Sequence, residues 1–363
     1  MNTTLKLLFL ALFQVANLFS IPQYQIIDLG LQQYTSTKVT SINDNGWVSG
    51  IIKDGGYTYI FVLDENKNLA KRAEKMFVRR PLINNSNEVF GTVIVWTGSG
   101  QWEFETDMVY KWTNPFSYFQ CLYFQHLGLP WEHSWAYGIN KDGNVWDINE
   151  LGQILVMNST SLTEAEDELF ENKIWIYEGD DFYKIEDKNF TAGFKINNAS
   201  QVLGSTVTGS VLDKNRMDKA SVYDHKDKSI RIFDFPDRSV GTDINDNGQV
   251  VGTYYDPQEK IFEGFLADLS GNITKISNFE PDVISNRGEI IGTYIYGKKK
   301  DQLALWKDGT VTDLKEVVDL VDDQGNKWDS IDSIVACNNA GYLIGNGTIN
   351  GHRHGFILAP IQK

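Results

Sequence analysis

The residues that most resemble a chemical site stand in one short stretch, Asp243-Ile244-Asn245-Asp246-Asn247-Gly248. The pattern Asp-x-Asn-x-Asn-Gly is how a calcium-binding loop begins, because its carboxylate and amide oxygens can converge on one cation. No acidic ligand follows at the usual distance, however, and among the related stretches elsewhere in the chain only Asp147 matches Asp243. The stretch is therefore predicted to be a structural turn and not a metal site.

The other candidates for chemistry form no recognisable catalytic set. The histidines lack the spacing of zinc ligands; they are His126, His133, His225, His352 and His354. There is neither a Gly-x-Ser-x-Gly elbow nor a glycine-rich phosphate loop. We predict no catalytic residue, no metal ligand and no cofactor. Carboxylates are numerous, so a glycosidase pair stays open, and two carboxylates converging in a cavity with shifted pKa values would favour it.

Aromatic side chains gather in residues 95–137, which hold five of the ten tryptophans. Exposed indole rings on one face could stack on sugar rings or on a partner protein. The candidate ligand-binding residues are Trp96, Trp102, Trp131 and Trp135. The alternative is that these rings belong to lengthened strands and pack in the core.

The chain is organised around a repeated turn, and Asp243–Gly252 contains its clearest copy. Further copies occupy residues 42–50, 83–91, 148–156, 196–204, 284–292 and 337–345. The column of Asn245 also contains Asn43, Asn84, Asn149, Asn197 and Asn338, with Ser285 as the exception. An Asn there can bond the backbone two residues on and hold the turn. Three residues later stand Gly46, Asn87, Gly152, Ser200, Gly248, Gly288 and Gly341, nearly all of which accept the positive φ that hairpin turns need.

Each turn joins two short apolar runs that are predicted to be strands. Four residues beyond the turn stand Gly50, Gly91, Gly204, Gly252, Gly292 and Gly345, with Val156 as the exception. Glycine at this phase of a strand indicates a close approach of another backbone. A third, often aromatic run follows, such as Glu263–Asp268, and then a fourth, such as Asn272–Ile276. Four antiparallel strands per repeat are typical of a β-propeller blade.

The chain is thus predicted to be all-β, with residues 21–363 forming a single β-propeller of seven four-stranded antiparallel blades. The last repeat has no fourth strand of its own, so Tyr24–Gly30 is expected to supply it and close the ring. Residues 139–143 resemble another copy of the turn. The sequence is therefore compatible with one irregular blade at this place or with a degenerate eighth repeat.

Residues 1–20 resemble a secretory signal peptide, with Lys6 before the apolar run Leu7–Phe19. The mature chain is expected to have no stable membrane span. The net charge of −15 argues against binding of nucleic acid. The two cysteines, Cys121 and Cys337, give no disulfide framework and are predicted to be buried in strands as ordinary apolar residues.

The repeat is similar to the HAF-type extracellular repeat of bacterial proteins. The residues that carry this resemblance are Asp243–Gly252, Glu263-Gly264-Phe265-Leu266 and Thr312-Asp313-Leu314. The sequence departs from the family pattern at its His-Ala-Phe position, where only His354-Gly355-Phe356 comes close, and at Val156. The resemblance implies a secreted, periplasmic or cell-surface protein, and no catalytic set accompanies the repeat.

Two classes of function are therefore considered. The first is a non-enzymatic binding module whose rigid loops engage an unknown protein or glycan. The second is a carbohydrate-active enzyme, a glycosidase or lyase, with carboxylates at the propeller channel and the aromatic stretch as a sugar platform. The first is preferred.

Overall fold

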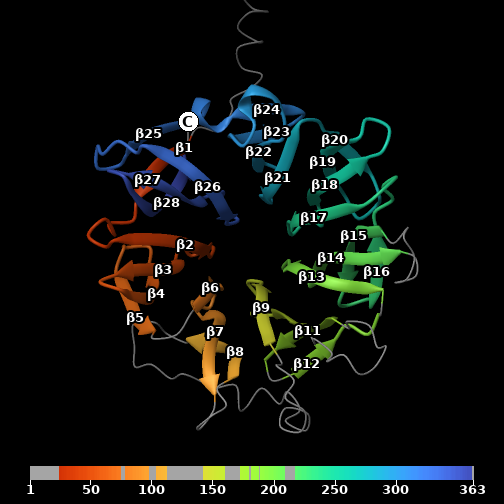
Figure 1. Ribbon diagram of the computed structural model, residues 1–363, viewed down its shortest axis with the longest axis horizontal. Coiled ribbons are helices and arrows are strands. Elements are labelled where there is room, and N and C mark those ends of the chain that lie inside the picture. Colours follow the sequence, from red (N-terminus) through yellow and green to blue (C-terminus); the bar gives the residue numbers. More distant parts are fainter. Residues whose placement is uncertain are drawn as a thin grey trace, which may run out of the picture.

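The structure is a computed structural model that describes residues 24–74, 78–97, 104–112, 142–159, 172–179, 181–187, 189–208 and 217–361. The described residues form seven antiparallel-rich sheets arranged in a ring (Figure 1). Alternating runs of β-branched and aromatic residues, interrupted every few residues by turn-forming Asn and Gly, favour such short strands over helices. No helix in these ranges has the length and apolar character needed to cross a membrane.

The first two sheets consist of β2 (Ser36–Ile42), β3 (Val48–Asp54), β4 (Tyr57–Leu63) and β5 (Leu69–Glu74), then β6 (Val78–Ile83), β7 (Val89–Thr97) and β8 (Phe104–Trp112). The next two consist of β9 (Asp142–Ile148), β10 (Ile154–Ser159), β11 (Asn172–Glu178) and β12 (Asp181–Lys184), then β13 (Phe190–Ile196), β14 (Gln201–Thr208), β15 (Met217–Asp224) and β16 (Ser229–Ile232). In each sheet, strands that are neighbours in sequence are neighbours in space.

Two further sheets follow the same order. They consist of β17 (Ser239–Ile244), β18 (Val250–Asp256), β19 (Ile261–Ala267) and β20 (Ile273–Ile276), then β21 (Phe279–Ile284), β22 (Ile290–Tyr294), β23 (Leu303–Lys307) and β24 (Thr310–Asp313). The short 3-10 helices η3 (Gly297–Lys299) and η4 (Leu314–Glu316) lie before β23 and after β24. The last sheet contains β25 (Val318–Asp322), β26 (Ser330–Cys337), β27 (Leu343–Ile349), β28 (His352–Pro360) and β1 (Tyr24–Asp28).

The number of complete blades differs from the prediction. Six sheets contain four or more strands, whereas the sheet of β6, β7 and β8 contains three within the described ranges. The predicted seven four-stranded blades are thus corrected to six, and the residues after β8, where a fourth strand was expected, lie outside the described part. Asp142 and Gly143, which resembled another turn, are the first residues of strand β9.

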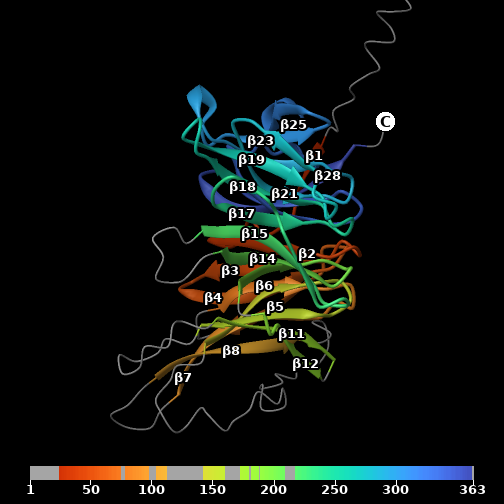
Figure 2. The same cartoon turned by 90° about the vertical axis from the view of Figure 1, so that its right-hand side faces the viewer.

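The amino-terminal strand closes the ring as predicted. β1 pairs antiparallel with β28, with Ile26 opposite Leu358 and Ile27 opposite Ile357. An additional strand that was not predicted, β25, pairs parallel with the outer edge of β1. β25, β1 and β28 lie side by side in both views (Figures 1 and 2). The chain end is therefore held on both edges.

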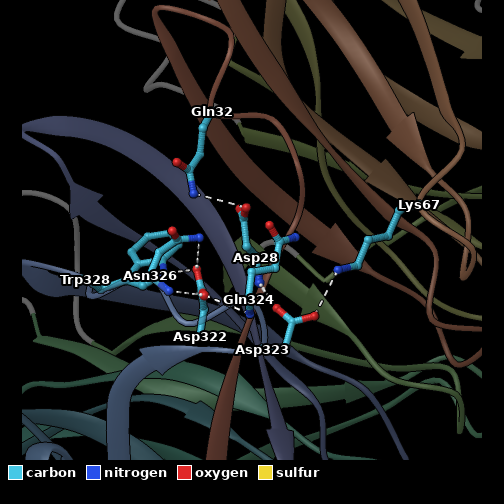
Figure 3. A network of polar contacts seen from close by, with 8 residues as sticks. All are labelled: Asp28, Gln32, Lys67, Asp322, Asp323, Gln324, Asn326 and Trp328. Carbon is cyan, nitrogen blue, oxygen red and sulfur yellow. Dashed lines mark hydrogen bonds and ion pairs between the residues drawn. The ribbon is translucent and has the colours of Figure 1, made fainter.

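Polar contacts join this closure to the first blade (Figure 3). Asp323 accepts a hydrogen bond from the backbone N–H of Asp28 at 3.1 Å, and the Lys67 ammonium lies 3.3 Å from the same carboxylate. Asp322, next to it, accepts bonds from the backbone of Gln324 and Asn326. The end of β1 is thus tied both to the loop after β25 and to the turn between β4 and β5.

The strand glycines lie in the second strand of their blades, where the innermost strand bulges toward them. At Gly252 a Cβ would collide with the carbonyl oxygen of Val240 and lie 2.9 Å from the ring of Phe265. The bulge lies between Gly241 and Asp243 on the facing strand. The predicted close approach of another backbone is confirmed here, and the Phe265 ring packs at the same point.

Candidate functional site at the mouth of the channel

The repeated turns have the geometry that the sequence predicted. In the clearest copy Gly248 N donates to the carbonyl of Asn245 at 3.0 Å, and Gly248 has a φ of 73°. The Asn245 Oδ1 accepts from the backbone N–H of Asn247 at 3.1 Å and of Gln249 at 2.9 Å. Positive φ recurs at Gly46, Asn87, Gly152, Ser200, Gly248, Gly288 and Gly341. Each turn is therefore a three-residue hairpin loop that ends in a left-handed residue.

The Asn side chains of these turns also link neighbouring blades, which the sequence did not reveal. The amide donates to the carbonyl oxygen of the corresponding residue in the next blade. This bond joins Asn43 to Asn84, Asn149 to Asn197, Asn197 to Asn245, Asn245 to Ser285 and Asn338 to Asn43, at distances between 2.8 and 3.1 Å. We call these seven first turn residues, including Asn84 and Ser285, the amide belt.

The next residue of each turn forms a second circle of polar side chains, Asp44, Asn85, Glu150, Asn198, Asp246, Asn286 and Asn339. The Asp246 carboxylate accepts three bonds, from Asn198 N at 2.9 Å, Asn198 Nδ2 at 3.0 Å and Asn286 Nδ2 at 2.8 Å. Asp44 accepts three in the same way from Asn339 and Asn85. These two carboxylates therefore act as acceptors between adjacent turns.

The two circles surround a cavity of about 140 Å³, to which the turns of six sheets contribute. Residues from so many blades can meet only near the axis of the ring, so we call this cavity the channel mouth. Its lining includes Glu150, Lys195 and Asp243 together with four residues of the amide belt, Asn149, Asn197, Asn245 and Asn338. The wall is thus polar and carries several negative charges.

Glu150 has the most unusual environment in the channel mouth. Its Oε2 atom is buried and has no hydrogen-bond partner within the described part of the chain. Burial, followed by the negative charges of Asp44 and Asp246, raises the pKa of Glu150 to about 8. Near neutral pH this carboxyl is therefore largely protonated.

Asp243, which suggested a calcium loop, is directed toward the next blade. Its Oδ2 accepts the backbone N–H of Ile284 at 2.9 Å, and its Oδ1 lies 3.7 Å from Lys195 Nζ. Asp147 accepts the N–H of Ile196 at 2.9 Å in the same manner. Burial raises the pKa of Asp243 and the Lys195 charge opposes that rise. Both acids thus act as ties between blades, and no cluster of three metal-ligating side chains occurs in the described ranges.

The channel mouth supplies the observation that was to favour an enzyme, since carboxylates converge in a cavity and the pKa values of two of them, Glu150 and Asp243, are raised. The chemistry available to it is nevertheless narrow. Asp44 and Asp246 are each engaged in three hydrogen bonds, and Glu150 alone has an unbonded oxygen. A glycosidase needs an acid and a second carboxylate that is free to act as base or nucleophile. The arrangement offers one protonated acid beside two occupied carboxylates.

Of the four candidate tryptophans, one lies in the described part of the chain. Trp96 belongs to strand β7. Trp102, Trp131 and Trp135 lie outside the described residues, as does Cys121. Trp112, from the same aromatic stretch, is 4% exposed and packs with Ile60, Val62, Ala70, Ile83 and Val89. Trp112 therefore agrees with the alternative interpretation, in which the aromatic rings belong to lengthened strands and pack in the core. Strands β7 and β8 are nine residues long each.

Cys337 and three of the histidines, His225, His352 and His354, lie in the described part of the chain, with His352 exposed at the start of β28. Cys337 lies in β26 as predicted, and its thiol is 3.5 Å from the carbonyl oxygen of Ile284 at the channel mouth. His354 is buried between β28 and β2, with Nδ1 3.3 Å from the Thr37 hydroxyl, and burial lowers its pKa. His225 packs against the rings of Tyr183 and Tyr223. These side chains lie in three different places and form no joint site.

Comparison with known proteins supports the architecture. No protein-family model matches the chain, and no curated protein matches it. The β-propeller domain of the trilobed protease from Pyrococcus furiosus, described as having an open velcro topology, superposes with a TM-score of 0.57 at 8% identity, over 91% of this chain and 95% of that one. The chain has the β-propeller fold.

Two acylaminoacyl peptidases also resemble this propeller. The one in complex with Z-Gly-Gly-Phe-chloromethyl ketone has a TM-score of 0.54 at 14% identity, covering 87% of this chain and 51% of its own. The Pyrococcus horikoshii enzyme has a TM-score of 0.54 at 15% identity, covering 78% and 45%. The propeller spans about half the length of these peptidases. At such identities the likeness shows the fold alone.

Proposed function

We propose that this propeller is an exported, non-enzymatic binding module that engages a protein or glycan through the face formed by its repeated turns. The observation that carries the proposal is the state of the carboxylates at the channel mouth. Asp44 and Asp246 hold adjacent turns together, so they are acceptors in a rigid frame and not free reactants. A rigid, polar, preformed face binds with little ordering cost.

Export is the second part of the proposal. It is supported by Lys6 followed by the apolar run Leu7–Phe19 and by the likeness of the repeat to the HAF-type extracellular family. Amino-terminal sequencing of protein recovered from outside the cytoplasm should find that residues 1–20 have been removed. Recovery of that protein with Met1 retained would argue against a cleaved signal peptide.

A carbohydrate-active enzyme is the second candidate, and one specific observation favours it. Glu150 has a pKa of about 8 and lies near the charges of Asp44 and Asp246. A protonated acid at neutral pH is what a glycosidase uses to protonate its leaving group. The fold-related peptidases do not bear on this choice, because their likeness extends to the fold only.

A glycan array probed with residues 21–363 tests the binding module. We expect a small set of related glycans to be retained and recovered with unchanged mass. Asp246→Asn, which preserves the size of this channel-mouth side chain but removes its charge, should weaken retention. Lys298→Gln, on a hairpin away from the turns, is the matched control and should not. Equal retention of the glycans by both variants would show that the face formed by the turns does not bind them.

A further inference from the structure

A second cavity lies at the seam where the first blade meets the closing blade. It has a volume of about 390 Å³, which is in the range of small-molecule sites. Its floor is apolar and consists of Ile27, Leu29, Ile42, Val48, Leu63 and Ile357. We call this cavity the seam pocket. It opens between the turns at residues 43–46, 64–68 and 338–342, and Asp44 and Asn338 also border the channel mouth.

Comparison with another blade explains why this pocket is open. The turn Asp64-Glu65-Asn66-Lys67-Asn68 corresponds to Asp268-Leu269-Ser270-Gly271-Asn272 between β19 and β20. The two turns are built alike, since Asp64 accepts from Asn68 N at 2.8 Å and Asp268 from Asn272 N at 3.0 Å. The second residue of the turn therefore has the same position in both blades.

That second residue fills the gap in one blade and not in the other. Leu269 packs against the cluster that contains Ile244 and Val250, and its Cδ1 lies 2.7 Å from where a Cβ on Gly248 would stand. Glu65, in contrast, is exposed. Its carboxylate accepts hydrogen bonds from the Trp47 indole N–H and from Asn66 Nδ2. No leucine thus packs over the corresponding residues Ile42 and Val48, which are themselves as buried as Ile244 and Val250, and the space that Leu269 fills in the other blade stays open toward the part-exposed Ile27 and Ile357.

The charges at the entrance decide what kind of group can fill the pocket. Three carboxylates, those of Asp44, Asp64 and Glu65, stand at the rim. Within the described part of the chain the one lysine or arginine of the lining is Lys67, and it is paired with Asp323 at 3.3 Å. An apolar floor beneath a negative rim fits a ligand that has an apolar body and a positively charged head.

We propose that the seam pocket binds small amines that combine an aromatic or aliphatic body with a cationic ammonium group. The apolar body packs against Ile27, Tyr342 and Ile357, the part-exposed apolar residues of the lining, and the ammonium group lies among the rim carboxylates. This inference goes beyond the proposed function and does not depend on it, because the ligand and the assay are different and Asp44 and Asn338 are the only described lining residues that the two cavities share.

Tryptamine is the probe, and indole-3-acetate, which has the same ring with the opposite charge, is its control. Isothermal titration of residues 21–363 should show tryptamine binding at least about tenfold more tightly than indole-3-acetate, as charge complementarity requires. Equal affinities for the two compounds, or no tryptamine binding up to about 10 mM, would overturn the proposal.

Four variants locate the binding. Glu65→Leu restores the leucine that the other blade has, and tryptamine affinity should fall about tenfold or more while the melting temperature stays the same or rises. Glu65→Gln keeps the size of the side chain and should lose a smaller part of the affinity.

Ala340→Trp places a ring at the entrance and should block binding, whereas Ala199→Trp, at the same turn position in another blade, should not. Unchanged tryptamine binding in Glu65→Leu and Ala340→Trp would place the site elsewhere and refute the assignment. Glycan retention by these variants reports separately on the proposed function.

Discussion

Asn338 donates its side-chain amide to the carbonyl oxygen of Asn43 at 3.1 Å, although the two residues are 295 positions apart. The bond joins the last turn to the first and is the same bond that links Asn245 to Ser285 within the chain. The same Asn-to-carbonyl bond that links neighbouring turns along the chain therefore also closes the ring. The backbone pairing of β1 with β28 closes it a second time. The amide belt predicts the first stability experiment.

Asn245→Ala should destabilise the propeller by about 2–3 kcal/mol, because it removes a buried donor to Ser285 and an acceptor for two backbone N–H groups. Asn247→Ala is the control in the same turn, since Asn247 is exposed and bonds only at the surface. It should cost no more than about 0.5 kcal/mol. Urea unfolding measures both, and equal costs would show that the belt contributes nothing beyond the turn itself.

Substitution of the turn glycines by Ala should destabilise the protein by different amounts, although these glycines have the same position in their turns. Gly46 and Gly248 both have positive φ, at 81° and 73°. A Cβ at Gly248 would lie 2.7 Å from Leu269 Cδ1, whereas at Gly46 the nearest atom, the Glu65 Cβ, is 3.9 Å away. Gly248→Ala should therefore cost about 2–3 kcal/mol and Gly46→Ala about 1 kcal/mol. The reverse order in chemical unfolding would contradict the packing of Leu269.

The turn itself could be predicted from the sequence because its causes are local. An Asn that bonds its own backbone and a Gly at positive φ act within five residues, and the repeated pattern shows them directly. The hydrogen bond from the Asn245 side chain to the Ser285 carbonyl oxygen depends on which blade lies beside that turn, and the spacing of residues in the sequence does not specify the neighbouring blade. The raised pKa of Glu150 has the same origin, since Asp44 and Asp246 come from other blades. β25 was missed because Val318–Asp322 lies between the fourth strand of one repeat and the last copy of the turn, and corresponds to no strand of the repeat.

Glu150 should make the stability of the protein depend on pH. Its pKa rises from 4.5 in the ordinary state to about 8 in the folded protein, so the folded state holds a proton that the unfolded chain releases between these values. The resulting stabilisation is complete below about pH 4.5 and is lost as pH rises through about 8. Glu150→Gln should remove this dependence. At pH 9 the variant should be more stable than wild type by on the order of a few kcal/mol.

The control for this titration is Glu259→Gln, because Glu259 is an exposed acid on a distant hairpin. Its unfolding free energy should follow that of the wild type from pH 5 to pH 9. If Glu150→Gln also followed the wild type across this range, then Glu150 would be ionised in the folded state, and the buried, unbonded Oε2 would have to be solvated.

The closing strand should be indispensable to the ring. Deletion of residues 21–30 removes β1 and leaves β28 and β25 without their common partner, so the edge of β28 is exposed. Exposed edges pair with other chains, and the deleted protein should elute as aggregates and lose its cooperative thermal transition. Deletion of residues 1–20 alone should leave the wild-type midpoint. A cooperative transition at the wild-type midpoint without residues 21–30 would show that β1 is dispensable.

The proposal that this propeller binds without catalysis is tested most directly by the fate of a bound glycan. A glycan retained on the array would be incubated with residues 21–363 at pH 6–7, where Glu150 is largely protonated, and analysed by mass spectrometry over a day. We expect the glycan to be recovered at its original mass, because Asp44 and Asp246 are held in the hydrogen bonds between turns. Formation of shortened or unsaturated products by the wild type, abolished in Glu150→Gln, would contradict this and identify the channel mouth as an active site.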